Sequence, residues 1–241
     1  GFQVCPLPTA VLSSHTQFPH FSFLDLTDEM PKIIAEWKSW KYSLMPFILA
    51  IWLTQTNPNR IGFINDFRRP DSLVVIDPCW VTMANYIPTS TKRLIIEMAN
   101  LITQADVITP NLTELFYLLD KPYKSRKTRT KNSKPTCTNS DKGPETVIIT
   151  SIPVQGDPRK TQYTPKPFEQ PLLESNLPLP ACPLSGTGDT FTSVITGSLM
   201  QGDSLPIALD RATQFILQGI RATFGYEYDN RGRYLIGKGA S

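Results

Sequence analysis

Residues 73–78 read Leu-Val-Val-Ile-Asp-Pro, an apolar and largely β-branched run that ends in a carboxylate and a proline. β-Branched residues favour strands, and an apolar run without polar alternation is typical of a strand covered on both faces. The carboxylate of Asp77 would then lie at the carboxyl end of that strand. The run therefore predicts a mostly parallel sheet packed between two layers of helices.

Two further runs repeat this pattern. Residues 106–111 read Asp-Val-Ile-Thr-Pro-Asn, and residues 146–151 read Thr-Val-Ile-Ile-Thr-Ser. Because strands that alternate with helices build a parallel α/β sheet, we expect ligands at the carboxyl ends of these strands. Apolar residues at helical spacing predict helices in 26–40 (with Thr27 as N-cap), in 92–105, in 113–119, from 188 onward, and in 204–221.

The remaining stretches give weaker patterns. Residues 4–12 predict a short strand and a turn. Residues 153–183 contain eight prolines and predict loops with an edge hairpin.

The composition fits one globular domain over residues 1–241. The chain is 40% hydrophobic and 19% charged, which allows one sizeable core. The longest apolar stretch, residues 44–53, is too short to span a bilayer, and we expect no secretory signal. The cysteines lack C-x-x-C spacing, which favours a reducing, cytoplasmic location over a disulfide or zinc framework; they are Cys5, Cys79, Cys137 and Cys182.

Basic residues are concentrated in one segment. Residues 121–142 hold eight Lys or Arg and one acid, Asp141, whereas the rest of the chain has 16 basic and 20 acidic residues. The segment could be a solvated loop or a nucleic-acid-binding tail. Because it has no aromatic residue beyond Tyr123, we expect no nucleic-acid partner.

The chemistry is concentrated in residues 185–191, Ser-Gly-Thr-Gly-Asp-Thr-Phe, which open a predicted helix. Glycines let backbone N–H groups approach an anion, and a helix N-terminus attracts phosphate. Asp189 could accept a proton from a hydroxyl that attacks a phosphoryl group. It could equally be a simple helix cap. The stretch is not a Walker P-loop, since no Gly-Lys-Ser/Thr follows.

With Gly197 and Gly202, this stretch resembles the anion-hole signature of the ribokinase superfamily. Further motifs resemble its vitamin B6 (pyridoxal/pyridoxine) kinase branch, in the right order along the chain: 7–9, 14–17, Asp25-Leu26, Asp77-Pro78, 105–114 and 149–151. The related hydroxymethylpyrimidine kinases usually carry Cys where Asp189 stands. The resemblance implies a ribokinase-like fold with three α/β/α layers.

The resemblance also implies roles for single residues. Asp189 would be the catalytic base and would contact the substrate, beside an anion hole made by Gly186, Thr187 and Gly188. Thr16 and Gln17 would contact the pyridine ring. The ATP side would be lined by Asp77, Thr109, Asn111, Glu114, Thr150 and Ser151. Glu114, through water, and Asp77 would organise Mg²⁺.

The implied activity is phosphorylation of the 5′-hydroxymethyl group of pyridoxal, pyridoxine or pyridoxamine. ATP is the co-substrate, Mg²⁺ the cofactor and a monovalent cation a further candidate. The implied assembly is a homodimer without nucleic-acid or membrane partners. Two other hypotheses stay open: a hydroxymethylpyrimidine kinase, and a non-catalytic remnant that binds nucleotide or a B6 vitamer.

Several of these residues also have purely structural interpretations. His15 would pack or hydrogen-bond. Asp77 before Pro78 could cap a turn, and Glu114 could favour the start of its helix by charge.

The chain departs from the family in places. The family's first strand and its Ser/Gly-rich substrate segment have no counterpart, so we expect a native N-terminal segment to be missing. The Gly-rich turn expected near residue 50 reads Trp-Leu-Thr-Gln at 52–55. The family's Gly-Asp run is absent from 79–88, and its second aspartate would fall at Thr82.

A shifted reading frame would explain the last departure. If the codons of residues 79–88 are read two bases later, one choice of third bases gives Leu-Gly-Asp-Asn-Gly-Lys-Leu-Tyr-Pro, the family's run. The same shift in 131–140 permits a helix tail ending in glycine. We therefore hypothesise compensated frameshifts, from gene decay or sequence error, and predict weak or no turnover for the chain as written.

Overall fold

The computed structural model describes residues 2, 4–14, 18, 20–39, 47–50, 59–78, 91–119, 143–154, 157–165, 173–175 and 186–224. Its centre is a six-stranded sheet with the order β3-β4-β5-β6-β7-β8. These strands are Phe47–Ala50, Val74–Asp77, Val107–Ile108, Thr146–Val154, Asp157–Pro165 and Leu173–Ser175. The first four run parallel. At one edge, β7 pairs antiparallel with β6, and β8 pairs antiparallel with β7.

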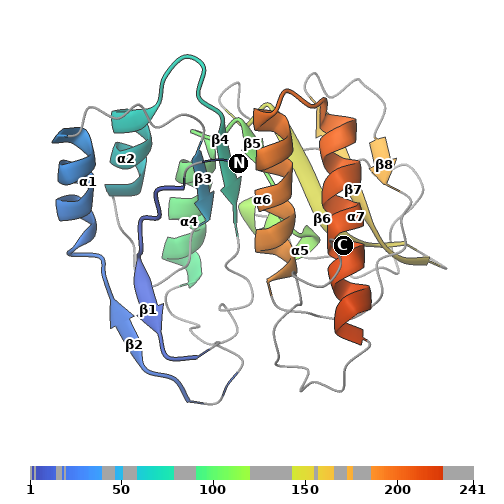
Figure 1. Ribbon diagram of the computed structural model, residues 1–241, viewed down its shortest axis with the longest axis horizontal. Coiled ribbons are helices and arrows are strands. Elements are labelled where there is room, and N and C mark those ends of the chain that lie inside the picture. Colours follow the sequence, from blue (N-terminus) through green and yellow to red (C-terminus); the bar gives the residue numbers. More distant parts are fainter. Residues whose placement is uncertain are drawn as a thin grey trace.

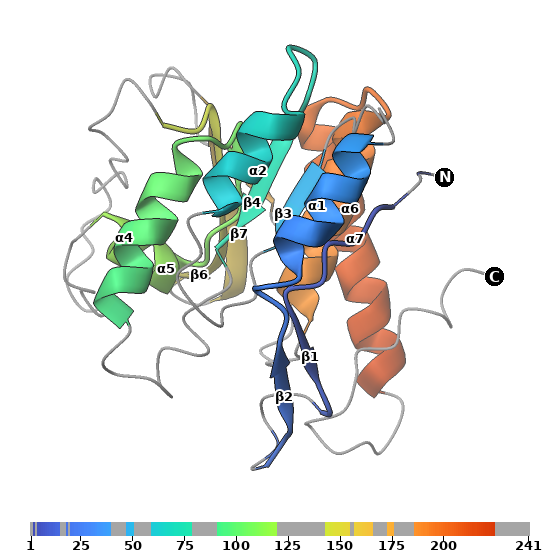
Figure 2. The ribbon, with the colours of Figure 1, turned by 90° about the vertical axis from the view of Figure 1, so that its left-hand side faces the viewer.

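The described helices are α1 (Met30–Ser39), which precedes β3, and α2 (Asn59–Phe67), α4 (Thr91–Ile102), α5 (Leu112–Leu118), α6 (Thr187–Met200) and α7 (Leu205–Phe224), which lie between and after the strands. Figure 2 shows α4 and α5 on one side of the sheet and α6 and α7 on the other. The predicted three-layer α/β/α fold with a mostly parallel sheet is confirmed.

The alternation of side chains along β4 explains the two cores. Val74 and Ile76 point toward α2, α4 and α5, whereas Val75 points toward α6 and α7. All three side chains are 0% exposed. An unbroken apolar run is therefore required, because both faces of the strand are covered.

A third cluster joins α1 to α2. It contains Met30, Ile34, Trp37, Phe63 and Phe67. The ring centroids of Phe63 and Phe67 are 5.0 Å apart, a spacing at which tilted aromatic rings attract. This cluster holds the N-terminal helices together, and Figure 1 shows them side by side at one end of the molecule.

A small separate sheet precedes α1. Strands β1 (Ala10–Leu12) and β2 (Phe23–Asp25) pair antiparallel. Figure 2 shows this hairpin extending beyond the body of the molecule. The strand predicted in residues 4–12 is thus confirmed, but in the described part of the chain its partner is β2 and not the main sheet.

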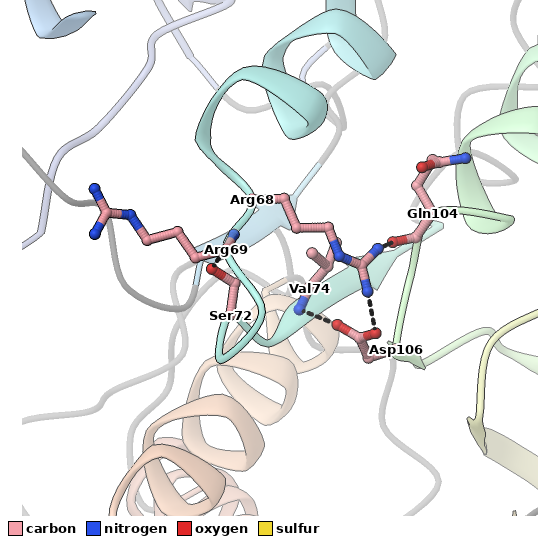
Figure 3. Close-up of polar contacts among 6 residues, drawn as sticks. All are labelled: Arg68, Arg69, Ser72, Val74, Gln104 and Asp106. Carbon is pink, nitrogen blue, oxygen red and sulfur yellow. Dashed lines mark hydrogen bonds and ion pairs between the residues drawn. The ribbon is translucent and has the colours of Figure 1, made fainter.

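The amino ends of β4 and β5 are joined by Asp106 (Figure 3). One carboxylate oxygen accepts the Val74 N–H at 2.7 Å, and the other forms an ion pair with Arg68 at 2.6 Å. Arg68 also donates to the Gln104 carbonyl at 2.7 Å. Asp106 therefore fixes how two central strands start, at the end of the sheet opposite Asp77.

One sequence prediction was wrong and another was confirmed. Thr27 is not an N-cap: α1 begins at Met30, and the Thr27 N–H donates to the Asp25 carboxylate at 2.8 Å in a turn before the helix. The edge hairpin predicted within residues 153–183 is confirmed as β7 and β8, which pair antiparallel at the edge of the sheet; residues 155–156, 166–172 and 176–183 lie outside the described residues.

Among the helices that the structure describes, none combines the length and the apolar character needed to cross a membrane.

Candidate active site

The start of α6 has the backbone geometry that the Gly-rich stretch predicts. Gly186 is the N-cap with φ +85°, a left-handed conformation that glycine adopts without a steric penalty. The first bonds of the helix return to its carbonyl, from the Thr190 N–H at 3.1 Å and the Thr190 hydroxyl at 2.7 Å. A helix cannot use its first N–H groups internally, so this end of α6 is suited to an anion.

Alternation along the strands brings polar side chains to the same place. Val75, Val107 and Ile148 belong to the core on the α6 side of the sheet. Two residues later on each strand come Asp77, Thr109 and Thr150, which therefore share that face at the carboxyl edge. The Thr150 N–H donates to the Pro110 carbonyl, which keeps these strand ends level.

The Asp77 carboxylate lies between the sheet and α6. One oxygen, Oδ1, accepts the Thr109 hydroxyl at 3.0 Å. The other, Oδ2, is 3.8 Å from the position that a Cβ would take on Gly188. Asp77 is only 5% exposed, and Oδ2 accepts no hydrogen bond from the described residues. Glycine at 188 therefore leaves space directly beside a buried carboxylate oxygen.

Burial raises the pKa of Asp77 from its ordinary value of 3.8 to about 6. The Thr109 hydroxyl opposes this shift in pKa, the negative charge of Asp189 adds to it, and the Thr192 hydroxyl opposes it again. Desolvation dominates because a charged group loses more hydration on burial than a neutral one. A cation that reaches Oδ2 would therefore stabilise the ionised form of the Asp77 carboxylate.

Asp189 lies in the first turn of α6, half-buried, near enough to Asp77 for its charge to be felt there. Two carboxylates therefore converge on a helix start that favours anions. This combination can hold a phosphate against the helix, deprotonate a hydroxyl with one carboxylate and face a cation with the other.

Glu114 has a clear structural role. Its carboxylate accepts the Asn111 N–H at 2.8 Å, and its own N–H donates to the Asn111 side chain at 3.0 Å. This is a capping box at the start of α5. The structural interpretation of Glu114 as a first-turn helix partner is confirmed, and it explains why a carboxylate that is 3% exposed is tolerated. Its role toward Mg²⁺ stays a prediction.

Asp77 and Glu114, the two residues predicted to organise Mg²⁺, form only part of a metal site. Within the described ranges, no group of three or more His, Cys, Asp or Glu could hold a metal ion. Asp77 Oδ2 is the one atom of the two predicted metal residues that is buried and without a hydrogen bond from the described residues. One carboxylate oxygen suits Mg²⁺, which usually binds one or two carboxylates and completes its shell with water and phosphate oxygens.

Other predicted residues are less fully described. Thr16 and Gln17 lie outside the described residues, as do His15, residues 52–55 and 79–88 and the basic segment 121–142. The backbone of Ser151 belongs to β6, directly after Thr150. The residues that the structure brings together are Gly186, Gly188, Asp189, Asp77 and Thr109.

Sequence reasoning missed Thr192. Its hydroxyl is 2.9 Å from the Thr109 hydroxyl, and the side chain is 1% exposed. The helical period could have indicated it, because Thr192 follows Asp189 by three residues and so lies on the same face of α6.

A profile of the phosphomethylpyrimidine kinase family matches residues 61–232. A search of curated protein sequences finds no significant match. A solved structure described as a candidate phosphomethylpyrimidine kinase from Bacteroides thetaiotaomicron is 52% identical, with a TM-score of 0.85, and covers 99% of this chain and 83% of its own. An orthorhombic form of the same description, with pyridoxal, is 54% identical, with a TM-score of 0.82, and covers 98% and 83%.

The fold extends to more distant proteins. Pyridoxal kinase from Lactobacillus plantarum is 21% identical, with a TM-score of 0.73, and the match covers 95% of this chain and 82% of that one. The family match covers more than half of the chain, and the Bacteroides structure is similar over nearly all of it. The chain belongs to the phosphomethylpyrimidine kinase family and has the ribokinase-like fold that this family shares with pyridoxal kinases.

Proposed function

We propose that this chain phosphorylates the 5′-hydroxymethyl group of pyridoxal, pyridoxine or pyridoxamine, with Mg-ATP as phosphoryl donor. The observation that supports this most directly is the position of Asp189, in the first turn of α6 and beside a second carboxylate, Asp77. Asp189 takes the hydroxyl proton, the substrate oxygen bonds to the γ-phosphorus, and the bond to the bridging oxygen breaks to release ADP.

Gly186, Thr187 and Gly188 bind the transferring phosphoryl group in this proposal. Their backbone N–H groups belong to the start of α6, where the helix dipole favours negative charge. Thr16 and Gln17 contact the pyridine ring. Thr109, Asn111, Thr150 and Ser151 line the ATP side at the carboxyl edge of β5 and β6.

Asp77 is the residue that would face Mg²⁺, since Oδ2 is buried and accepts no hydrogen bond within the described part of the chain. The cation supplies charge neutralisation for the phosphates when it is bound. Glu114 would act through water, while its capping box keeps it fixed. A monovalent cation is a further candidate for the same edge of the sheet.

The choice of substrate rests on two observations. A structure 54% identical to this chain is described as a form with pyridoxal. Residue 189 is Asp, whereas the hydroxymethylpyrimidine kinases that the chain also resembles usually carry Cys there. The runner-up is phosphorylation of a hydroxymethylpyrimidine, which the description of the matching family favours.

Substrate competition tests this choice. We expect kcat/KM for pyridoxal to exceed that for 4-amino-5-hydroxymethyl-2-methylpyrimidine in a coupled assay that follows ADP. The reverse order would support the runner-up. Binding of ATP or pyridoxal by calorimetry, without ADP formation from any of these alcohols, would instead identify a non-catalytic remnant.

The resemblance also leads us to propose a homodimer, which analytical ultracentrifugation would measure. We expect turnover of the chain as written to be slow, because residues 79–88 lack the family's Gly-Asp run.

A further inference from the structure

A buried chain of hydroxyl groups links α6 to the edge of the sheet. Thr192, in the second turn of α6, lies 2.9 Å from the Thr109 hydroxyl, which in turn lies 3.0 Å from Asp77 Oδ1. Thr192 and Thr109 are 1% and 2% exposed. Water does not compete at such sites, so both hydrogen bonds are stronger than they would be at the surface.

Thr192 differs from most other hydroxyl-bearing residues of α6 and α7, although Ser198 also bonds outside the helix, to the Asp203 carboxylate just after α6. The hydroxyls of five of these donate to the carbonyl four residues earlier in their own helix, a common way to satisfy a buried hydroxyl. They are Thr190, Ser193, Thr196, Thr213 and Thr223. The Thr192 hydroxyl instead reaches out of its helix to a residue 83 positions away in the sequence.

The number of protons on the two hydroxyls limits how Thr192, Thr109 and Asp77 can be hydrogen-bonded. A threonine hydroxyl carries one proton and two acceptor lone pairs. With the Thr109 proton donated to Asp77 Oδ1, the Thr192 hydroxyl donates to Thr109. Thr192 therefore occupies a lone pair of Thr109 and leaves the Thr109 proton committed to Asp77. The Thr192 hydroxyl also lies near enough to Asp77 to lower the pKa of its carboxyl.

Among the described residues, the Asp77 carboxylate is therefore held through only one of its oxygens, Oδ1. With Oδ1 fixed by Thr109, Oδ2 is turned toward the start of α6, 3.8 Å from the Cβ position of Gly188. Phe191 and Ile195, the neighbours of Thr192 on α6, are apolar core residues. The Thr192 hydroxyl is thus a polar group on a helix face that also carries core residues, and its partner is the Thr109 hydroxyl.

We propose that Thr192 is a positioning residue, which acts through Thr109 to hold the Asp77 carboxylate with one oxygen facing the phosphate-binding start of α6. This deepens the proposed function and rests on it in one respect, namely that Asp77 faces the Mg-ATP side of the site. Thr192 itself touches neither substrate nor nucleotide.

Three variants test the proposal. Thr192→Val keeps the shape and removes the hydroxyl, and Thr192→Ser keeps the hydroxyl. Thr196→Val is the matched control, because Thr196 is also 1% exposed on α6 but donates within its helix, to the Thr192 carbonyl at 2.8 Å. Each is assayed for pyridoxal phosphorylation and for unfolding by urea.

We expect Thr192→Val to lower kcat/KM for Mg-ATP about tenfold, the effect of one hydrogen bond, with the KM for pyridoxal unchanged. Thr192→Ser should stay within about twofold of wild type if its hydroxyl reforms the bond. Thr196→Val should lose stability but not kcat/KM. Equal kinetics for Thr192→Val and wild type, or equal losses in Thr192→Val and Thr196→Val, would overturn the proposal.

Crystal structures of the Thr192 variants separate this proposal from the proposed function, because they need no turnover. We expect the Asp77 carboxylate to rotate in Thr192→Val and to keep its position in Thr192→Ser. An unchanged Asp77 in Thr192→Val would refute the positioning role even in an active enzyme. If the wild-type chain phosphorylates no B6 vitamer, the proposed function fails, and the crystal structures still decide the role of Thr192.

Discussion

At the residue scale, Asp77 combines burial with a charge. Its folded-state pKa of about 6 lies above its ordinary value of 3.8, so the folded protein holds this proton more tightly than the unfolded chain. The stability that this contributes is complete below the unfolded pKa and is lost as the pH rises through the folded pKa. The ionised carboxylate is thus a cost to folding near neutral pH.

Asp77→Asn removes this titration. We expect its free energy of unfolding, relative to wild type, to rise between pH 4 and pH 7 by up to about 3 kcal/mol, from a shift of roughly two pKa units. Urea unfolding without nucleotide or Mg²⁺ measures it. Asp28→Asn, which changes an exposed carboxylate, reports the effect of net charge alone. A stability difference independent of pH would contradict the assignment.

The sequence indicated much of the site at this scale. Gly186, Gly188 and Asp189 were recognisable because they form one contiguous motif, and Asp77 and Thr109 because each follows an apolar strand run. The helical period places Thr192 on the same face as Asp189, but it does not reveal its role, which depends on a partner 83 residues away in the sequence. Glu114 was recognised, but its sequence position alone does not distinguish two roles for its carboxylate, a capping box and the organisation of Mg²⁺.

At the element scale, the start of α6 depends on the backbone of Gly186. Gly186→Ala places a side chain at φ +85°, although nothing described lies within 4 Å of its Cβ position. We expect a loss of about 1–2 kcal/mol in the free energy of unfolding, from backbone strain alone. Weaker ATP binding, measured by calorimetry, should accompany it.

Gly62→Ala is the matched control for that prediction. Gly62 lies within α2, and its Cβ position is also clear of described atoms, but its φ is not positive. We expect it to stabilise the protein by about 0.5–1 kcal/mol, since glycine is unfavourable inside a helix. Similar losses in both variants would show that the left-handed conformation is not the cause.

Asp106, which joins the amino ends of β4 and β5, gives a second prediction at this scale (Figure 3). Asp106→Ala leaves the N–H of Val74, a residue that is 0% exposed, without its acceptor, and should cost about 1–3 kcal/mol. Arg68→Gln removes a partly exposed ion pair and an exposed hydrogen bond to the Gln104 carbonyl, and should cost at most about 1 kcal/mol. Urea unfolding compares them, and equal losses would contradict this division of roles.

The elements differ in how well the sequence predicts them. The strands β4, β5 and β6 were predictable because burial on both faces demands apolar runs. Helix α2 was not, since its sequence Asn-Arg-Ile-Gly-Phe-Ile-Asn-Asp-Phe has little helical propensity and is held by the aromatic cluster with α1. The hairpin of β7 and β8 was predicted within residues 153–183, but the prolines of this stretch left its bounds open.

At the scale of the whole molecule, the fold matches a kinase family while one of the family's motifs is absent from the sequence. We expect a chain in which residues 80–88 are replaced by Leu-Gly-Asp-Asn-Gly-Lys-Leu-Tyr-Pro to phosphorylate pyridoxal at least about tenfold faster, because a carboxylate returns to the Mg-ATP side. Resequencing the gene across codons 50–60, 79–88 and 125–142 tests the frameshift hypothesis itself. Unchanged codons together with no gain in turnover would contradict it.

The central claim is that the start of α6, with Asp189 as the base, transfers phosphate to a B6 vitamer. The most direct test is ATP-dependent formation of pyridoxal 5′-phosphate by the wild-type chain and by the chain with residues 80–88 restored, each with and without Asp189→Asn. We predict slow formation by the first and faster formation by the second. Asp189→Asn should reduce both by about a hundredfold or more. Formation by neither chain, or rates that Asp189→Asn leaves unchanged, would contradict the account.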